Sequence, residues 1–279
     1  MLCDAHCHPF DLLDYIDSYK LESLRKETAC AASSWNREQF EYHEGLAKKS
    51  KDSGQATLVL CCAVHPQLPL FLLSGQNAGP EKQDPAFRIK NEFFPLLENL
   101  AAEKRLDALG ETGFDLFDSE YRQTEAIQDE VFAFHLELAL KYGLPLVIHV
   151  RKAMHKIFVN ARDLKKVRSV IFHSWPGTEG EAGSLLERGI NVFFSFGTGI
   201  VNNHKRAQRC CAVLPADRIL PETDAPYLPL KSKKFSSWDD LPAIYDKMAE
   251  LRKEAGSPVN DFDELEVICA ENFFRAFGL

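Results

Sequence analysis

The sequence has no hydrophobic run that approaches the roughly 20 apolar residues of a membrane span. It also lacks, at its start, the basic segment and the long apolar stretch of a secretory signal. From these two patterns we expect a soluble cytoplasmic protein that has no membrane partner, and no obligate protein partner is evident.

Cysteine pairs of the CxxC type are absent, although the chain has eight cysteines. Most of them lie inside apolar runs, which indicates buried reduced thiols and no disulfide framework. Cys7 stands between His6 and His8. Because successive side chains of a strand point to opposite faces, we do not expect Cys7 to join these histidines at a metal.

An excess of positive charge is missing as well, since the formal net charge is −8. The protein therefore lacks the basic composition of one that coats nucleic acid. Nucleic acid remains possible as a substrate, because bound divalent cations attract phosphate locally. No internal repeat, low-complexity tract or domain boundary is evident, so we expect one domain over residues 1–279, with a surface loop at Ser74–Pro85.

Short apolar runs alternate with amphipathic stretches along the 279 residues, a pattern typical of parallel α/β proteins. We predict strands at residues 2–7, 28–33, 56–64, 105–111, 144–149, 168–173, 189–195 and 218–223. Helices are predicted at 121–142 and 183–188, and a last helix at 261–279 is expected to close the barrel. Metal-binding side chains at five separate strand ends favour a closed (β/α)8 TIM barrel over an open sheet, which gathers its ligands at one switch point.

His6 and His8 end the first predicted strand. Residues two apart on a strand share a face, so both imidazoles can bind one ion, and Asp4 shares that face too. The HxH pattern alone is weak evidence. Glu111 lies in Gly110-Glu111-Thr112-Gly113, where the glycines leave room for close approach, and a carboxylate can bridge two cations roughly 3.5–4 Å apart. An N-cap or a loop salt bridge is the alternative role for this glutamate.

His149 and His173 end two successive predicted strands, and this repetition favours ligands over structural histidines. Arg151 follows His149 by two residues and suits a phosphate, although a salt bridge on the rim is the alternative. Asp224 follows the last strand and suits a metal ligand that also orients the attacking water and takes its proton.

Other candidate residues have less specific surroundings. His65 ends the third strand and is expected to donate a hydrogen bond to substrate. Trp175 is expected to stack on a terminal base, with packing on the rim as the equal alternative. Glu222 shares the parity of Asp224 and is predicted to point toward the site or to make a structural pair. We predict structural roles for the remaining histidines, His43, His135, His155 and His204.

Together these motifs resemble the TatD-type metal-dependent DNases of the amidohydrolase superfamily. The resemblance runs from Asp4-Ala5-His6-Cys7-His8 to the C-terminal Asn272–Leu279, with His65-Pro66, Gly110–Gly113, Pro145–Arg151, Phe172-His173-Ser174 and Glu222–Pro226 in family order. It implies a (β/α)8 barrel with one or two divalent cations. By the family pattern, His6, His8 and Asp224 hold the first ion, His149 and His173 hold the second, and Glu111 bridges them.

The resemblance also implies a magnesium-dependent nuclease that acts on DNA, often from the ends. Imidazole ligands favour zinc, manganese or nickel, so the metal bound in a purified sample need not be the working Mg²⁺ or Mn²⁺. The sequence departs from the family at His155, at Ser174–Gly177 and at Pro221. Two alternatives stay open, a small-molecule amidohydrolase, lactonase or phosphoesterase, and a metal-binding scaffold without catalysis.

Overall fold

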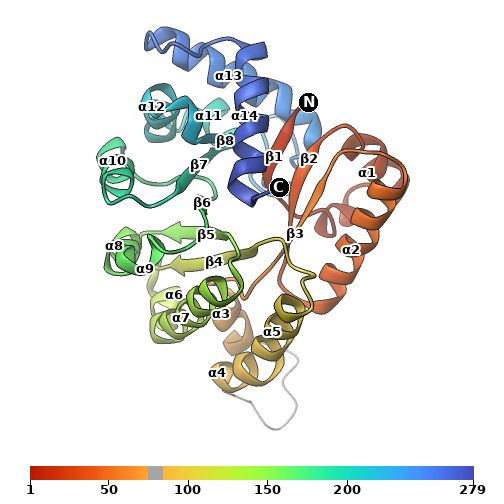
Figure 1. Ribbon diagram of the computed structural model, residues 1–279, viewed down its shortest axis with the longest axis vertical. Helices are drawn as coiled ribbons and strands as arrows, with labels where there is room; N and C mark the ends of the chain where they lie inside the picture. Colours follow the sequence, from red (N-terminus) through yellow and green to blue (C-terminus); the bar gives the residue numbers. More distant parts are fainter. Residues whose placement is uncertain (75–83) are drawn as a thin grey trace.

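Eight short strands form the centre of the part of the molecule that the structure describes, and helices surround them (Figure 1). The computed structural model describes residues 1–74 and 84–279, so most of the loop predicted at Ser74–Pro85 lies outside the described residues. The strands are β1 Cys3–Cys7, β2 Ala29–Ser34, β3 Leu58–Cys62, β4 Leu109–Asp115, β5 Leu146–Arg151, β6 Val170–Phe172, β7 Val192–Phe196 and β8 Ile219–Pro221.

The helices follow the strands in the alternation expected for a (β/α)8 barrel. They are α1 Ser18–Arg25, α2 Arg37–Asp52, α3 Leu68–Ser74, α4 Pro85–Arg88, α5 Phe94–Ala102, α6 Ser119–Arg122, α7 Glu125–Tyr142, α8 Met154–Val159, α9 Ala161–Leu164, α10 Glu179–Glu187, α11 Thr198–Val201, α12 Lys205–Val213, α13 Leu241–Glu254 and α14 Phe262–Phe277. Short 3-10 or π turns lie at Asp11–Asp14, Ile89–Phe93, Ala216–Arg218 and Trp238–Asp240. None of the helices in the described ranges is long and apolar enough to cross a bilayer.

All paired strands are parallel, and their order in space is their order in the sequence. The ladder has two arcs, β1-β2-β3 and β4-β5-β6-β7-β8. Between β3 and β4, a parallel bridge joins Cys61 to Ala108. Between the segment after β8 and β1, the Asp224 backbone amide donates to the His6 carbonyl at 2.9 Å. The predicted fold class, a (β/α)8 TIM barrel, is confirmed.

The fourth strand differs from its prediction, because β4 runs from Leu109 to Asp115 and Glu111 lies inside it. Glycines usually indicate a loop, but here they let β4 approach β5. A Cβ on Gly110 would stand 2.4 Å from the Val147 Cβ, and one on Gly113 would stand 2.0 Å from the His149 carbonyl oxygen. The glycines therefore make room for the neighbouring strand.

Two predicted helices also have other bounds. The one predicted at 121–142 is divided into α6 and α7, and the one predicted at 183–188 begins earlier, as α10. The start of α10 is set by a capping box, in which Thr178 and Glu181 satisfy each other's backbone amides. The start of α10 thus follows from this capping contact and not from the hydrophobic period.

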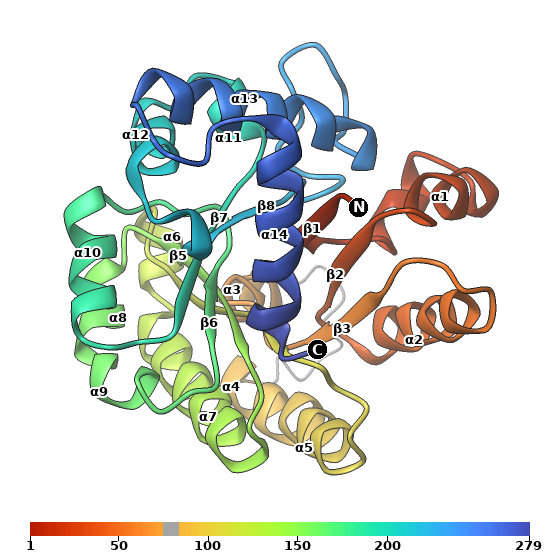
Figure 2. The same ribbon diagram turned by 45° about the horizontal axis from the view of Figure 1, so that its top comes forward.

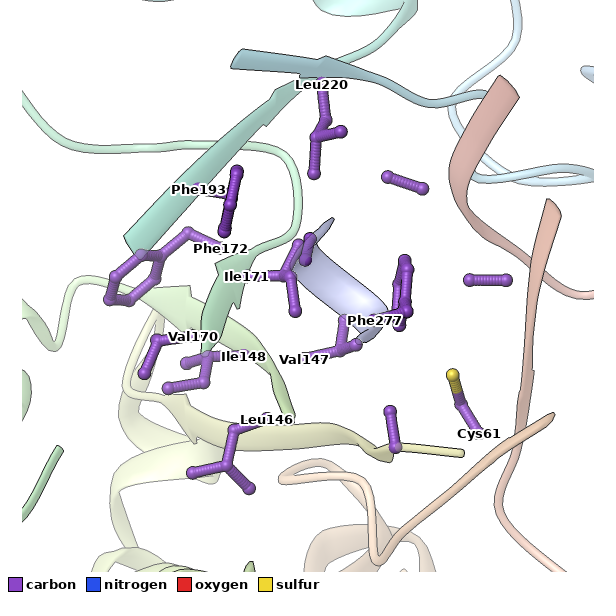
Figure 3. Close-up of a cluster of buried hydrophobic side chains, with 14 of the residues drawn as sticks. Cys61, Leu146, Val147, Ile148, Val170, Ile171, Phe172, Phe193, Leu220 and Phe277 are labelled. Carbon is purple, nitrogen blue, oxygen red and sulfur yellow. The ribbon is translucent and has the colours of Figure 1, made fainter. Parts of the chain in front are cut away.

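The final helix lies where it was expected and covers one end of the barrel (Figure 2). Asp261 caps α14, and the Asn272 amide donates to the carbonyl of Ile219, the first residue of β8, at 2.8 Å. Phe277 lies among the buried side chains of the strands, beside Val147 and Ile171 (Figure 3). Since α14 closes the amino ends of the strands, the carboxyl ends remain open for a site.

The eight cysteines are buried free thiols, as predicted. Cys7 points away from its histidine neighbours, and its Sγ lies 3.4 Å from the Ala31 carbonyl on β2. The alternation of side chains on β1 therefore separates the thiol from the imidazoles.

Candidate metal centre

Glu111 lies at the centre of a group of histidines at the carboxyl ends of the strands. Its Oε2 lies 3.2 Å from the His6 Nε2 and 3.8 Å from the His8 Nε2. Its Oε1 lies 2.7 Å from the His149 Nδ1 and 3.4 Å from the His173 Nε2. The two oxygens of one carboxylate thus face two different pairs of imidazoles, which is the arrangement a bridging ligand needs.

The first pair is completed by Asp224. Its Oδ1 lies 3.6 Å from the His6 Nε2 and 3.5 Å from the His8 Nε2, while these two nitrogens are 3.1 Å apart. The side chains come from β1, β4 and the segment after β8, so three parts of the chain that are distant in sequence supply this group. The structure brings together the residues expected to hold a first ion.

The second group includes one residue that was predicted to contact substrate. The Nε2 of His65 lies 3.4 Å from the Glu111 Oε1, and His65, Glu111 and His149 form a set whose ligand atoms lie within 4.8 Å of one another. His173 stands with His6 and Asp224 in another such set. His65 is therefore close enough to serve as a ligand, and His173 borders both groups.

This donor set fits divalent cations. Three groups of buried or half-buried imidazoles and carboxylates converge, and each offers three ligand atoms within 4.8 Å of one another. Histidine nitrogens suit Zn²⁺, Mn²⁺ and Ni²⁺, and carboxylate oxygens suit Mg²⁺ and Mn²⁺. Buried ionisable groups in this number are unfavourable unless they are paired or bind an ion.

The charges of the centre are coupled. Burial raises the pKa of Glu111, but the imidazoles of His65 and His173 outweigh it and hold the pKa well below its usual value. Burial lowers the pKa of His6 and so favours the neutral form that binds metals. Burial also lowers the pKa of His173, but the Glu222 carboxylate and its neighbours raise it well above the ordinary value.

Asp224 occupies a backbone conformation that few side chains adopt. Its φ is +56°, in the left-handed region where aspartate and asparagine are enriched. Its carbonyl accepts a 2.6 Å hydrogen bond from the Tyr227 amide, which fixes the turn. Burial raises the pKa of Asp224, but His173 and the two histidines of β1 outweigh it and lower the pKa. The carboxylate is therefore ionised at neutral pH.

Asp4 braces this turn against β1. Its Oδ1 accepts from the Thr223 amide at 2.9 Å, and its Oδ2 accepts from the Thr223 hydroxyl at 2.6 Å. Burial raises the pKa of Asp4 to about 7. These two contacts join β1 to the segment that follows β8.

Asp115 is a site residue that the sequence reasoning missed. It is fully buried. Its Oδ2 accepts a hydrogen bond from the side-chain nitrogen of Gln67 at 2.7 Å and lies 3.3 Å from the His149 Nε2. The same oxygen accepts from the Arg151 guanidinium at 3.3 Å. Burial raises the pKa of Asp115, but the hydrogen bonds from His149 and Gln67 lower it to about 2. The signal was its position at i+4 from Glu111 on a strand that ends four residues later than predicted.

Arg151 lies beside the centre in a defined orientation. The guanidinium is held by Asp115 and lies over the Phe117 ring, 4.3 Å from its centroid. Its side chain keeps 42% of its surface exposed. The rim ion pair foreseen as an alternative is present, and the exposed part of the guanidinium remains free to bind an anion.

Glu222 makes the structural pair that was one of its two predicted roles. Its carboxylate accepts from the Ser174 amide at 2.8 Å and from the Ser174 hydroxyl at 2.6 Å, and it also accepts from the Ser195 hydroxyl. Its Oε2 lies 3.3 Å from the His173 Nδ1. Glu222 therefore orients the His173 ring from behind, with the opposite nitrogen facing Glu111.

Trp175 has the packing role and not the stacking role. It is 2% exposed, and its ring packs edge-on against Phe172 and Phe194, with centroids 5.1 and 4.6 Å away. An indole that is buried to this degree offers no platform to a base. Although Trp175 lies two residues after the candidate ligand His173, its side chain packs into the core against the two phenylalanines.

A cavity of about 1260 Å³ opens over the metal centre. Beyond the predicted site residues, its wall includes Lys205 and Arg206, both exposed, at the start of α12. His204, for which we predict a structural role, also lines the cavity. Cationic side chains thus gather at this opening although the chain as a whole is acidic.

The chain is similar to known proteins over its full length. The family model for TatD related DNase matches residues 3–278. The Escherichia coli K12 protein named uncharacterized metal-dependent hydrolase YcfH is 29% identical, over all of this chain and 96% of its own length. The Cronobacter sakazakii protein named 3'-5' ssDNA/RNA exonuclease TatD is 36% identical over 57% of this chain and 62% of its own length.

The fold has a close counterpart among solved structures. YJJV, a TatD homologue from Escherichia coli K12, superposes with a TM-score of 0.76 over 100% of this chain and 98% of its own, at 21% identity. Because the family model covers nearly the whole chain, the protein belongs to the TatD-related DNase family.

Proposed function

We propose that the protein is a divalent-metal-dependent phosphodiesterase that hydrolyses nucleic acid, with single-stranded ends as its substrate. The observation that carries the proposal is Glu111, whose two oxygens face separate groups of imidazoles. This arrangement suits two divalent cations, with Mg²⁺ or Mn²⁺ as the working metal and Zn²⁺ or Ni²⁺ as species that also bind. The residues that would hold them are His6, His8, Glu111, His149, His173 and Asp224, with His65 within reach.

Cations bound in this centre would supply a Lewis acid for phosphate oxygens and would lower the pKa of water to near neutrality. The protein's own part is to orient the reactants. Asp224 is ionised and lies beside His6 and His8, so it is placed to accept a hydrogen bond from the attacking water and then its proton. Its fixed left-handed turn holds that carboxylate in one direction.

Two side chains at the mouth of the cavity, Arg151 and His65, are placed to bind the phosphate. Arg151 presents the exposed part of a guanidinium that Asp115 and Phe117 hold in place, and a guanidinium matches two phosphate oxygens at once. His65 is 24% exposed at its side chain and lies within 3.4 Å of Glu111, so it is placed either to ligate or to donate to a phosphate oxygen. Burial lowers the pKa of His65.

The cavity favours a polymer over a small substrate. Its volume exceeds the roughly 300–1,000 Å³ of pockets that enclose small molecules. Lys205 and Arg206 line the wall and would meet phosphates beyond the one that is cleaved. The name of the Cronobacter relative, an exonuclease for single-stranded DNA and RNA, supports the same class of substrate.

The reaction class is tested with bis(p-nitrophenyl) phosphate, a phosphodiester too small to need the outer cavity. Metal-stripped protein is assayed with Mg²⁺, Mn²⁺ or Zn²⁺ added back, beside a lactone and an amide under the same conditions. We expect metal-dependent release of nitrophenol and no comparable turnover of the other two substrates. Preferred hydrolysis of the lactone or amide by folded, metal-loaded protein would contradict the proposal.

A further inference from the structure

An aromatic pair stands in the cavity on the side of β2 and β3. Trp35 follows the end of β2 and is half-buried, and Phe71 lies on α3 and is 65% exposed. Both side chains line the cavity that contains the metal centre. Their ring centroids are 6.4 Å apart and the rings meet edge to face, so Phe71 keeps an open face. We call Trp35 and Phe71 the aromatic shelf.

Hydrogen bonds connect the Trp35 end of the shelf to the segment that follows β1. The Trp35 amide donates to the Gln39 side-chain oxygen at 3.1 Å, and the Gln39 side-chain nitrogen donates to Asp11 at 2.9 Å. Asp11 lies within 3.9 Å of the His8 ring and also accepts from the Tyr227 hydroxyl. The position of Trp35 is therefore set by groups that border a metal ligand.

A second chain of contacts fixes Phe71. Its amide donates to the Gln67 carbonyl at 3.1 Å in the first turn of α3. The side chain of Gln67 donates to Asp115 at 2.7 Å, and Asp115 in turn contacts Arg151. Phe71 is thus held at a set distance from the guanidinium that is placed to bind phosphate.

The shelf faces a different kind of wall across the barrel mouth. Lys205 and Arg206 follow β7, whereas the shelf follows β2 and β3, which belong to the other arc of strands. The metal ligands come mainly from the strands between them. A substrate that crosses the cavity therefore meets aromatic rings on one side of the centre and cations on the other.

We propose that Trp35 and Phe71 form a base-binding subsite, on which an unpaired nucleobase next to the scissile phosphate stacks. Stacking on aromatic side chains is the general means of holding single strands without reading their sequence. A base in a duplex has both faces covered by its neighbours, so the subsite selects frayed or single-stranded ends. This inference rests on the proposed function and names the nucleotide part of its substrate.

Tryptophan fluorescence gives a readout of the subsite that is independent of turnover. Trp175 and Trp238 are 2% and 3% exposed, so a ligand that quenches emission by contact reports on Trp35. We would titrate the cleavage-deficient Asp224→Asn variant with a single-stranded DNA octamer. A second octamer has the same phosphates but abasic residues at its 3′ and 5′ ends. We expect quenching by the first and little by the second.

Activity separates stacking from a structural role. Phe71→Leu is expected to raise the KM for a single-stranded oligonucleotide by about tenfold, in line with the loss of one stacked base. The KM for the octamer with abasic ends, which has no terminal base to stack, should stay at the wild-type value. Phe87→Leu is the matched control, since Phe87 is 56% exposed on the neighbouring helix α4 and lies outside the described lining of the cavity.

Equal binding and equal quenching by the two octamers would overturn the subsite, as would equal effects of Phe71→Leu and Phe87→Leu. An equal rise in the KM for the octamer with abasic ends in Phe71→Leu would also overturn it, since that substrate offers no terminal base to the shelf. These failures differ from failure of the proposed function, which shows as an inactive wild-type protein on every phosphodiester.

Discussion

Replacement of Asp115 by asparagine is expected to weaken metal binding although Asp115 is not placed as a ligand. The Nδ1 of His149 faces Glu111 at 2.7 Å, and its Nε2 faces Asp115 at 3.3 Å. With Nδ1 as the ligand atom, the Nε2–H donates to the Asp115 carboxylate, which fixes the ring and makes it a better ligand. The Asp115→Asn change keeps the shape of the side chain and removes its charge.

The size of the effect follows from the surroundings of Asp115. Its hydrogen bonds lower the pKa from 3.8 to about 2 against the opposing effect of burial. A difference of nearly two units corresponds to about 2 kcal/mol of interaction with the ionised form. Loss of a carboxylate that supports a metal-binding histidine typically lowers metal affinity by about 10- to 100-fold. We expect a change within that range.

The assay is competition for Zn²⁺ between metal-stripped protein and a chromophoric chelator. Asp163→Asn serves as the control, because it removes a carboxylate from a surface pair with Lys166, in which a 46% exposed side chain contributes little. Thermal unfolding of the metal-free variants verifies that both remain folded. If Asp115→Asn binds Zn²⁺ as tightly as the wild type and the control, the role assigned to Asp115 is wrong.

Four further predictions follow from the same geometry. Gly113→Ala should destabilise the fold by about 3 kcal/mol or more in urea denaturation, because its φ is +130° and its Cβ would lie 2.0 Å from the His149 carbonyl oxygen. Burial lowers the pKa of His135 to about 4, so as pH falls the unfolded chain takes up a proton before the folded protein does. The free energy of unfolding should therefore fall by about 3 kcal/mol between pH 6.5 and pH 4. Urea midpoints measured across that range would show this loss, and a flat profile would contradict it. His149→Ala should lower the number of ions retained after dialysis and reduce activity strongly, and unchanged metal content would contradict its role as a ligand. Asp224→Ala should abolish turnover of bis(p-nitrophenyl) phosphate while the protein stays folded, and a wild-type rate would refute its role as ligand and base.

The strand pattern of the sequence predicts most of the fold and the place of the candidate metal centre. Side chains at strand ends meet in a closed barrel whatever their separation in sequence, so His6, Glu111 and Asp224 were identified from local position alone. Their convergence within hydrogen-bonding distances appears in the structure. The bounds of β4 are not predicted in this way. In the sequence, Gly110 and Gly113, which allow β5 to pack closely, cannot be distinguished from glycines of a loop.

The hydrophobic pattern of the sequence does not predict contacts between side chains that are distant in sequence. Trp175 follows a ligand histidine and looked suited to a base, but its burial depends on Phe172 and Phe194. Trp35 follows two serines and carries no local signal, and only the position of Phe71 on α3 makes it part of a pair. Asp115 was missed for the same reason, since its partners come from β5 and from the loop before α3.

The most direct measurement is cleavage of end-labelled single-stranded and double-stranded DNA by metal-stripped protein, with Mg²⁺, Mn²⁺ or Zn²⁺ added back and Asp224→Ala as the control. We predict metal-dependent shortening of the single strand from one end, slower attack on the duplex, and no products with the variant. Intact DNA in the presence of folded, metal-loaded wild-type protein would contradict a nuclease.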